Sequence, residues 1–288
     1  MRTRIKKVIA AAAAVVTTTT AVVAGLSGGG ASAYSAGLMA YGIAGNGTLM
    51  LQFWTATPDQ NDWVRRITGL SGDTAVVGLD FRVQDGKLYA VGNKGGIYTI
   101  GIPSAIATKV SQLQVALYGT NFGVDFNPAA DRLRVISDNG QNLRHNLNDH
   151  TTIEDTTLTT PPATGPARGV TAAAYTNNDL NAATNTTLFD INTTTDQVVI
   201  QSPANNGLLV ATGNLGFDAD ANAGFDIFSD LTNGRTTAAI AYASLTPVVP
   251  AGQFPVQNFY SIDLLTGTPT FIGTFPLDVT DVAIALDK

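Results

Sequence analysis

A short motif recurs along this chain at intervals that favour a repeat fold. A glycine, an apolar residue, an aspartate and a second apolar residue open one segment at Gly78-Leu79-Asp80-Phe81, and the same order returns from Gly123 and from Gly224. Weaker copies begin at Gly169 and Val279, so successive starts lie 45 to 55 positions apart. Periods of about 40 to 50 residues are typical of the four-stranded blades of a β-propeller. We therefore expect an all-β propeller.

Each repeat resembles a set of short strands joined by tight turns. In the unit that begins near Gly78, strands are expected at residues 77–82, 88–91 and 97–100, with Asp85-Gly86 in the first turn. Asp-Gly and Asn-Gly pairs favour hairpin turns because these turns need positive φ. The chain is also rich in Thr, Asn, Gly and Val, and Glu154 is its single glutamate. This composition suits strands and turns better than helix interiors.

The two ends of the repeat region complete one another. Residues 279–286 look like the first strand of a unit with nothing after it, whereas residues 38–53 look like later strands without a first one. We expect the C-terminal strand to join the N-terminal blade and close the ring, because closure removes exposed sheet edges. Five blades across residues 34–288 give a period of about 51 residues. Six blades remain an alternative, since the last long unit contains an additional stretch at residues 238–260.

Several longer segments resemble a known family. They are Gly123-Val124-Asp125-Phe126-Asn127-Pro128, Asp131-Arg132-Leu133-Arg134-Val135, Gly140-Gln141-Asn142-Leu143-Arg144, Ala173-Ala174-Tyr175-Thr176-Asn177-Asn178 and Leu215-Gly216-Phe217-Asp218. In order and spacing they are similar to a family of exported bacterial propeller-like proteins classed as a domain of unknown function. The resemblance runs from about Met39 to Leu286. It implies a propeller and export, and it brings no substrate, cofactor or catalytic residue.

The N-terminus has the pattern of an export signal. Four cations at positions 2–7 precede a mostly apolar stretch at residues 8–26, and Ala31-Ser32-Ala33 matches a cleavage site. We expect residues 1–33 to be a cleaved signal peptide and residues 34–288 to form one secreted, extracellular domain. An uncleaved membrane anchor is the alternative, but Thr17 to Thr20 interrupt the apolar run. No later segment has an apolar run long enough for a membrane span.

The charge of the chain excludes some partners. Removal of the signal leaves 12 Lys and Arg against 22 acidic residues, a formal net charge of −10. Nucleic acids and anionic membranes bind clustered cations, so neither is an expected partner. The chain has no Cys and two His, which excludes thiol catalysis and disfavours a transition-metal site. We expect a monomer whose partner is an extracellular glycan, the cell wall or a protein.

One acidic segment has part of a calcium-binding pattern. Asp218, Asp220 and Asn222 alternate along the chain, and Asp226 follows. Calcium takes six to eight oxygen ligands, and this spacing is similar to the first half of an EF-hand loop. The segment departs from that loop at its sixth position, which lacks glycine, and at its twelfth, which lacks glutamate. Calcium is thus a candidate cofactor, and an Asx-rich turn without metal is the alternative.

The repeated aspartates form a second candidate site. If the opening strands surround the axis of the propeller, Asp80, Asp125, Asp226 and Asp281 occupy equivalent positions, with Thr171 in the remaining blade. Such a ring would hold a cation or polar ligand in the central channel. Alternatively, each carboxylate accepts backbone N–H groups from the adjacent blade and locks the ring. We favour the lock, because a residue repeated in most blades more naturally serves what all blades share.

Basic and aromatic residues provide weaker candidates. The arginines and histidines cluster in or near one repeat, and we expect ordinary surface ion pairs there; these residues are Arg132, Arg134, Arg144, Arg168, His145 and His150. The sequence does not place a nucleophile beside His145, so a role as general base is unsupported. Trp54 and Trp63 flank a segment at residues 53–67 that reads as a loop, and we expect both to close the seam between the first two blades.

Three classes of function fit these observations. The first is a secreted, non-catalytic propeller that binds a partner or polymer, which the lack of a catalytic set favours. The second is a calcium-dependent hydrolase similar to the lactonase propellers, an analogy of fold alone. The third is a structural component of the cell envelope or extracellular matrix. The sequence favours the first class and names no ligand.

Overall fold

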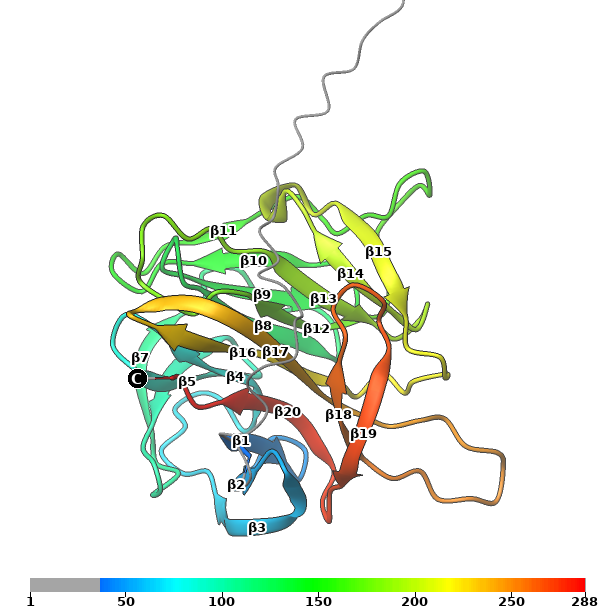
Figure 1. The fold of residues 1–288 in the computed structure, drawn as a ribbon. Helices are drawn as coiled ribbons and strands as arrows, with labels where there is room; N and C mark the ends of the chain where they lie inside the picture. Colours follow the sequence, from blue (N-terminus) through cyan, green and yellow to red (C-terminus); the bar gives the residue numbers. More distant parts are fainter. Residues whose placement is uncertain (1–36, 288) are drawn as a thin grey trace, which may run out of the picture.

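The computed structural model describes residues 37–287, and the predicted signal peptide lies outside this range. Within it, the strands form five antiparallel sheets of four strands each. Five strands contact one another in a closed ring, in the order β20, β4, β8, β12 and β16. Each is the inner strand of one blade, and Figure 1 shows the other strands spreading outward from them. The fold is therefore an all-β, five-bladed propeller, and the six-bladed alternative is wrong.

Each blade runs from an inner strand at the axis to an outer strand at the rim. Blade 1 contains β20 (Val279–Ile284), β1 (Met39–Ala44), β2 (Leu49–Trp54) and β3 (Thr57–Arg66), and blade 2 contains β4 (Val76–Arg82), β5 (Lys87–Gly92), β6 (Gly96–Ile100) and β7 (Ala107–Gln112). Blade 3 contains β8 (Phe122–Asn127), β9 (Arg132–Ser137), β10 (Asn142–His145) and β11 (Thr152–Glu154). Blade 4 contains β12 (Val170–Tyr175), β13 (Leu188–Asn192), β14 (Gln197–Gln201) and β15 (Leu209–Asn214), with a 3-10 turn, η1 (Ala204–Asn206), before β15. Blade 5 contains β16 (Gly224–Thr232), β17 (Arg235–Leu245), β18 (Asn258–Ile262) and β19 (Pro269–Thr274).

The last strand of the chain closes the ring, as predicted. Strand β20 pairs antiparallel with β1, with Val282 opposite Gly42 and Ile284 opposite Ala40. The N-terminal blade thus receives its inner strand from the C-terminal end of the sequence. This arrangement leaves neither β1 nor β20 as an exposed edge.

The Asn-Gly turn between β1 and β2 illustrates how turn residues position the blades. Asn46 and Gly47 have φ values of 54° and 78°, the left-handed conformation that a tight hairpin requires. A Cβ at Gly47 would lie 2.1 Å from the carbonyl oxygen of Val76, in the inner strand of the next blade. The Val76 N–H also donates to the Gly47 carbonyl at 2.9 Å. The turn therefore needs glycine both for its φ and for this close contact.

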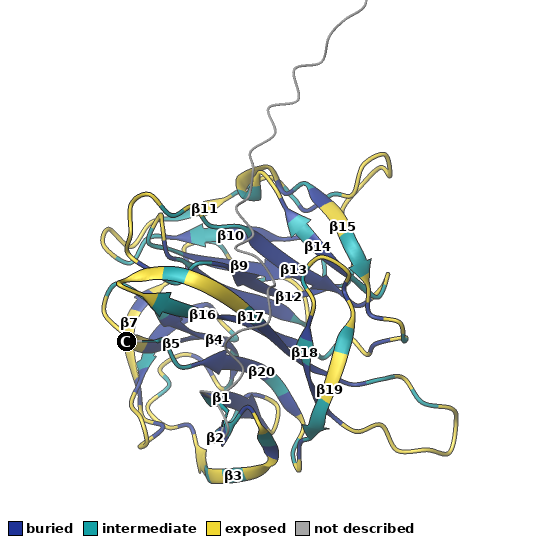
Figure 2. Ribbon diagram, viewed as in Figure 1, coloured by how far each residue is buried: buried dark blue, intermediate teal, exposed yellow. Residues whose placement is uncertain are grey.

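The hydrophobic core is divided among the seams between blades. At the seam of blades 5 and 1, Phe53, Phe259 and Phe275 pack edge to face with centroids 5.0 to 5.4 Å apart. At the seam of blades 2 and 3, Tyr89 packs on Phe126 at 5.2 Å. Figure 2 shows the buried inner strands at the centre and exposed residues along β3 and β19. The inner strands consequently lie in the buried interior of the molecule.

One sequence expectation about the first blade is wrong. Residues 53–67 read as a loop, but β3 (Thr57–Arg66) spans most of them and pairs with β2. This strand is the outer edge of its blade, and most of its side chains are exposed, so polar residues cost little there. Trp63 packs at the seam of blades 1 and 2, where its ring centroid lies 6.1 Å from that of Tyr41. Within residues 37–287, the structure contains no helix with the length and hydropathy of a membrane span.

Candidate functional site

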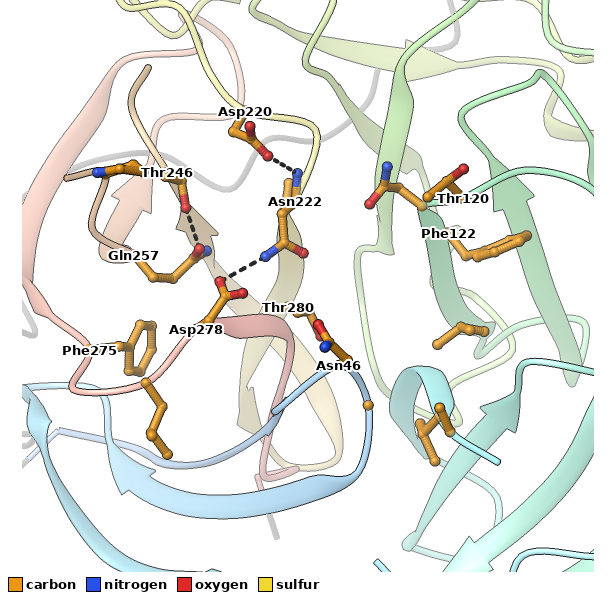
Figure 3. Close-up of a pocket in the computed structure, with 18 of the residues that line it drawn as sticks. Asn46, Thr120, Phe122, Asp220, Asn222, Thr246, Gln257, Phe275, Asp278 and Thr280 are labelled. Carbon is orange, nitrogen blue, oxygen red and sulfur yellow. Dashed lines mark hydrogen bonds between the residues drawn. The ribbon is translucent and has the colours of Figure 1, made fainter. Parts of the chain in front are cut away.

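A cavity opens at the end of the ring where the inner strands begin. Its volume is about 840 Å³. The first residues of β4 and β8, a residue of β20 and the residue before β16 all line it, together with turns from blades 1, 2 and 5. Figure 3 shows the labelled side chains around this opening. We call it the axial pocket, because residues at or next to the starts of four inner strands line it.

A network of amide and carboxylate groups holds one wall of the axial pocket. The backbone N–H of Asn222 donates to Asp220 Oδ1 at 3.1 Å, and Asn222 Nδ2 donates to Asp278 Oδ1 at 2.9 Å. Thr246 donates its hydroxyl to Gln257 Oε1, and the two residues come from opposite ends of the long β17–β18 connection. Asp220 and Asp278 are exposed. Both aspartates line the pocket.

The lining combines polar groups with two aromatic rings. Amides and hydroxyls come from Asn46, Asn93, Thr120, Asn121, Asn222, Thr246, Gln257 and Thr280. Phe122 and Phe275 are 9% and 5% exposed and contribute apolar surface. Among the described residues, the only charged ones that line the pocket are the two aspartates. The pocket thus offers acceptors, amide donors and apolar surface, and this lining lacks a cation that would bind an anion.

Below this opening, three aspartates of the inner strands converge on the axis. Asp80 of β4, Asp125 of β8 and Asp226 of β16 are fully buried, and each contributes a carboxylate oxygen to a group whose members lie within 4.8 Å of one another. Within residues 37–287, no other group of three or more His, Asp or Glu residues meets this criterion. We call these three residues the axial carboxylates.

Backbone N–H groups of neighbouring blades bond to these carboxylates. Phe126 N donates to Asp80 Oδ2 at 2.7 Å, and Tyr175 N donates to Asp125 Oδ1 at 3.1 Å. Ile284 N donates to Asp226 Oδ2 at 2.5 Å. In each case the carboxylate belongs to one blade and the donor to the inner strand of the next. These contacts are of the type that the blade-lock interpretation requires.

Asp281 makes the same kind of bond from a different register. Leu79 N donates to Asp281 Oδ2 at 2.8 Å, which links blade 1 to blade 2. In β8, the residue after Asp125 donates the bond between blades, from Phe126 N to Asp80. In β20 the matching donor is Ile284 N, which bonds to Asp226. The β20 residue equivalent to Asp125 is therefore Ala283. Asp281 therefore lies two residues earlier on its strand, on the same face.

Thr171 also does not occupy the position equivalent to Asp125 that the repeat pattern indicated. Tyr175 N is the donor to Asp125, so Ala174 is the counterpart of Asp125 in β12. A bulge between Val170 and Ala172 shifts the register and places Thr171 within it. Blades 4 and 5 are joined instead by Asn178, whose backbone N–H donates to Ser229 Oγ and whose Nδ2 donates to the Ile227 carbonyl.

Burial and mutual repulsion raise the pKa values of the axial carboxylates. Desolvation is the largest cause for each, and it raises the pKa of Asp226 to about 7. The pKa values of Asp80 and Asp125 lie well above the ordinary range, because desolvation is followed by repulsion from the other aspartates. Two carboxylates about 5 Å apart repel by about 3 kcal/mol at an effective dielectric constant of about 20. This repulsion favours neutralisation of part of the charge by protons or by a cation.

The four residues of the predicted calcium loop are separated. Asp226 lies on the axis with Asp80 and Asp125, whereas Asp220 and Asn222 line the axial pocket. Asp218 is exposed, and its carbonyl accepts the Val248 N–H. The structure does not bring these oxygens together as ligands of one ion. The two oxygens of Asp226 accept the N–H groups of Ile227 and Ile284.

The arginine cluster differs from the surface pairing that we expected. Arg134 is 3% exposed and donates to Asp155 at 2.8 Å, and Arg144 donates to the same carboxylate at 2.9 Å. Arg132 donates to the carbonyls of Ala130 and Asp131. A serine that the sequence did not indicate, Ser111, lies between His145 and His150. It belongs to another blade and lies 34 positions from His145, so no local pattern could have revealed it.

Comparison with known proteins gives a family and a fold. A family model described as a domain of unknown function, DUF4394, matches residues 49–285. Among curated proteins, no sequence matches the chain. A structural genomics protein of unknown function from Bacteroides thetaiotaomicron has a TM-score of 0.50 and 14% identity, and the match covers 87% of this chain and 67% of that one. A glutaminyl cyclase from Myxococcus xanthus has a TM-score of 0.43 and 14% identity, with coverages of 78% and 95%. At such low identity, the first of these likenesses shows the fold alone.

Proposed function

The chain belongs to the DUF4394 family of unknown function, and we propose that it is a secreted, non-catalytic binding module whose ligand occupies the axial pocket. The observation that carries this proposal is the chemistry of the lining. Amides, hydroxyls and two exposed carboxylates surround a cavity of about 840 Å³. This volume is within the usual range for small-molecule sites.

The lining favours a neutral, hydroxyl-rich ligand such as a glycan. Carboxylate and amide oxygens accept hydrogen bonds from sugar hydroxyls, and amide N–H groups donate to them. Val256, which also lines the pocket, is 50% exposed and offers apolar surface for the C–H face of a sugar. An anionic ligand fits poorly, because Asp220 and Asp278 would repel it and the described lining contains no Lys, Arg or His to attract it.

The pocket supports binding more than catalysis. The residues described along its wall include no Ser, Cys, His or Lys, so they offer no pair of nucleophile and base of the usual kind. The axial carboxylates are buried and do not line it. The expected export signal supports an extracellular partner, for which a glycan of the cell wall or matrix is the simplest candidate.

Binding of arrayed neutral oligosaccharides and soluble cell-wall fragments to residues 34–288 tests this proposal. We expect saturable binding to at least one glycan, and a decrease in affinity of about tenfold in Asp278→Ala, because a hydrogen bond to a charged group contributes about 1.5 to 3 kcal/mol. Asp59→Ala removes an exposed carboxylate from β3, outside the pocket lining, and is the matched control. Failure of every glycan class to bind, or equal affinity in the two variants, would overturn the proposal.

A further inference from the structure

One serine hydroxyl is held between two imidazoles at the seam of blades 2 and 3. Ser111 lies on β7, the outer strand of blade 2, and its Oγ is 2.8 Å from His145 Nε2 and 2.9 Å from His150 Nδ1. His145 ends β10 of blade 3, and His150 lies in the turn that precedes β11. None of these three residues lines the axial pocket.

A fourth group orients the buried imidazole. His145 Nδ1 is 2.9 Å from Thr152 Oγ1, and Thr152 Oγ1 accepts the backbone N–H of Gln114 at 2.9 Å. Ser111 Oγ and Thr152 Oγ1 thus contact opposite nitrogens of the His145 ring. This order of hydroxyl, imidazole and orienting oxygen is the arrangement that activates a nucleophile.

When both imidazoles are neutral, two arrangements satisfy all three contacts with Ser111 donating its proton to one of the rings. In one, Thr152 donates to His145 Nδ1, His145 Nε2–H donates to Ser111, and Ser111 donates to His150. In the other, His145 Nδ1–H donates to Thr152, Ser111 donates to His145 Nε2, and His150 Nδ1–H donates to Ser111. The second arrangement is the one that a nucleophilic serine requires. In it, His145 accepts the serine proton while His150 stabilises negative charge on Oγ.

Burial keeps His145 in the form that a base needs. The residue is fully buried, and desolvation, followed by repulsion from His150, lowers its pKa to about 4. The ring is therefore uncharged at neutral pH, and in the second arrangement its Nε2 lone pair accepts the Ser111 proton. Ser111 retains 8% exposure, at the boundary between buried His145 and exposed His150. A small acyl donor would approach from the His150 side.

We propose that Ser111 is a nucleophile that accepts acyl groups from activated esters, with His145 as its general base. Ser111 Oγ attacks the ester carbonyl, and its proton moves to His145 Nε2. The bond between the carbonyl carbon and the leaving oxygen then breaks, and the leaving group takes the proton from His145. The products are an O-acyl serine and the free alcohol, and no oxidant or metal takes part. This reactivity is separate from ligand binding in the axial pocket.

Acetylation by p-nitrophenyl acetate tests the proposal in the folded chain, with acetylated residues identified by peptide mass mapping. We expect one acetyl group on Ser111, its absence in Ser111→Ala, and a rate about a hundredfold lower in His145→Gln, since general-base catalysis contributes about 10² to 10⁴. Ser104 is the matched control, because it lies in an exposed turn of the same blade and bonds within that turn. Acetylation of Ser111 at the same rate as Ser104 would overturn the proposal.

The pH profile separates a base-activated serine from an ordinary one without any variant. Because the pKa of His145 is about 4, the rate at Ser111 should be nearly constant between pH 6 and 8. A serine activated only by hydroxide would instead accelerate about tenfold per pH unit. His150→Gln should lower the acetylation rate at Ser111 about tenfold. Because His150 is exposed, this variant provides a test even if His145→Gln does not fold. A hydroxide-like profile, or an unchanged rate in the variant of either histidine that folds, would contradict the proposal.

Discussion

Arg132 and Arg134 lie two residues apart on β9, on the same face, and have different environments. Arg134 is buried and donates to Asp155, Asn142, Asn205 and the Tyr175 hydroxyl. Arg132 is only partly buried and donates to two nearby carbonyls. The difference arises because the 3-10 turn of blade 4, which contains Asn205, covers the end of the Arg134 side chain. Residue type and strand alternation alone do not reveal such a contact between blades.

We predict that Arg134→Met lowers the free energy of unfolding by about 3 kcal/mol. The substitution removes one partner of a buried ion pair, which typically costs about 3 to 5 kcal/mol. Retention of Arg144 as a partner of Asp155 places the expected loss at the lower end. Denaturant unfolding measures the difference. Arg132→Met, on the same strand, should change the free energy by less than about 0.5 kcal/mol, and equal losses in both variants would contradict the prediction.

At the scale of strands, β20 carries contacts in two directions. It pairs with β1 in its own sheet, and its Asp281 accepts the Leu79 N–H of blade 2 while its Ile284 N–H donates to Asp226 of blade 5. One six-residue strand thus joins three blades. Among the five inner strands described, no other has to be supplied from the opposite end of the chain.

Removal of residues 279–288 is therefore expected to prevent cooperative folding. The truncated chain loses a strand that pairs with β1 and two of the bonds that join blades, and it exposes the edge of β1. We expect aggregation or a broad, non-cooperative thermal transition by circular dichroism. Addition of a peptide of residues 277–288 should restore a sharp transition, because the peptide supplies the same strand. A truncated protein that melts as sharply as the intact chain would show that closure is dispensable.

The sequence predicted the elements whose pattern repeats in each blade. It did not predict the elements whose conformation depends on contacts with other strands or blades. The inner strands recur with Gly, Asp and apolar residues because every blade presents the same face to the axis, so blade number and closure could be predicted. Strand β3 was missed because an exposed outer strand tolerates Pro58 and Asp59. Thr171 and Asp281 were assigned to equivalent positions because the bulge in β12 and the two-residue offset in β20 leave no trace in the motif. The axial pocket combines turns from several blades, and no single sequence motif contains its lining.

At the scale of the whole molecule, the ring concentrates acidic groups on its axis. Burial raises the pKa values of Asp80, Asp125 and Asp281 well above their ordinary range, and that of Asp226 to about 7. Asp190, buried on β13 of blade 4, has a raised pKa for the same main reason. The native state therefore retains protons at pH values where the unfolded chain has lost them. Stability contributed by such groups is complete below about pH 4 and declines as pH rises through the native pKa values.

A histidine opposes this trend in part of the range. The pKa of His145 is lowered from 6.5 to about 4, so between these values the unfolded chain binds the extra proton and stability rises with pH. Above pH 6.5 this contribution is constant, and the carboxylates act alone. The window from about pH 6.5 to about 8.5 is thus where the carboxylates can be tested.

We predict that the protein becomes less stable from about pH 6.5 to about 8.5, with Asp226 contributing in the lower part of this window, near its native pKa of about 7. Each proton retained only by the native state changes the free energy of unfolding by at most about 1.4 kcal/mol per pH unit. For a domain of this size, about 1 kcal/mol corresponds to about 2 to 4 °C in melting temperature. Asp226→Asn should reduce the slope, because it removes the group whose pKa of about 7 falls in this window. Asp263→Asn should leave the slope unchanged, since the pKa of this carboxyl is lowered by N–H donors of its own turn.

The same measurement distinguishes protons from a metal ion as the neutralising charge. In the presence of chelator, the decline with pH should appear in full, because only protons are then available to offset the repulsion among Asp80, Asp125 and Asp226. Excess calcium would show that a cation replaces those protons if it raises the melting temperature at the alkaline end of the window. The increase should then be smaller in Asp226→Asn. A melting temperature that stays flat across the window in chelator would contradict protonated axial carboxylates. The backbone N–H groups of Phe126, Tyr175 and Ile284 would then be sufficient to hold three ionised aspartates on one axis.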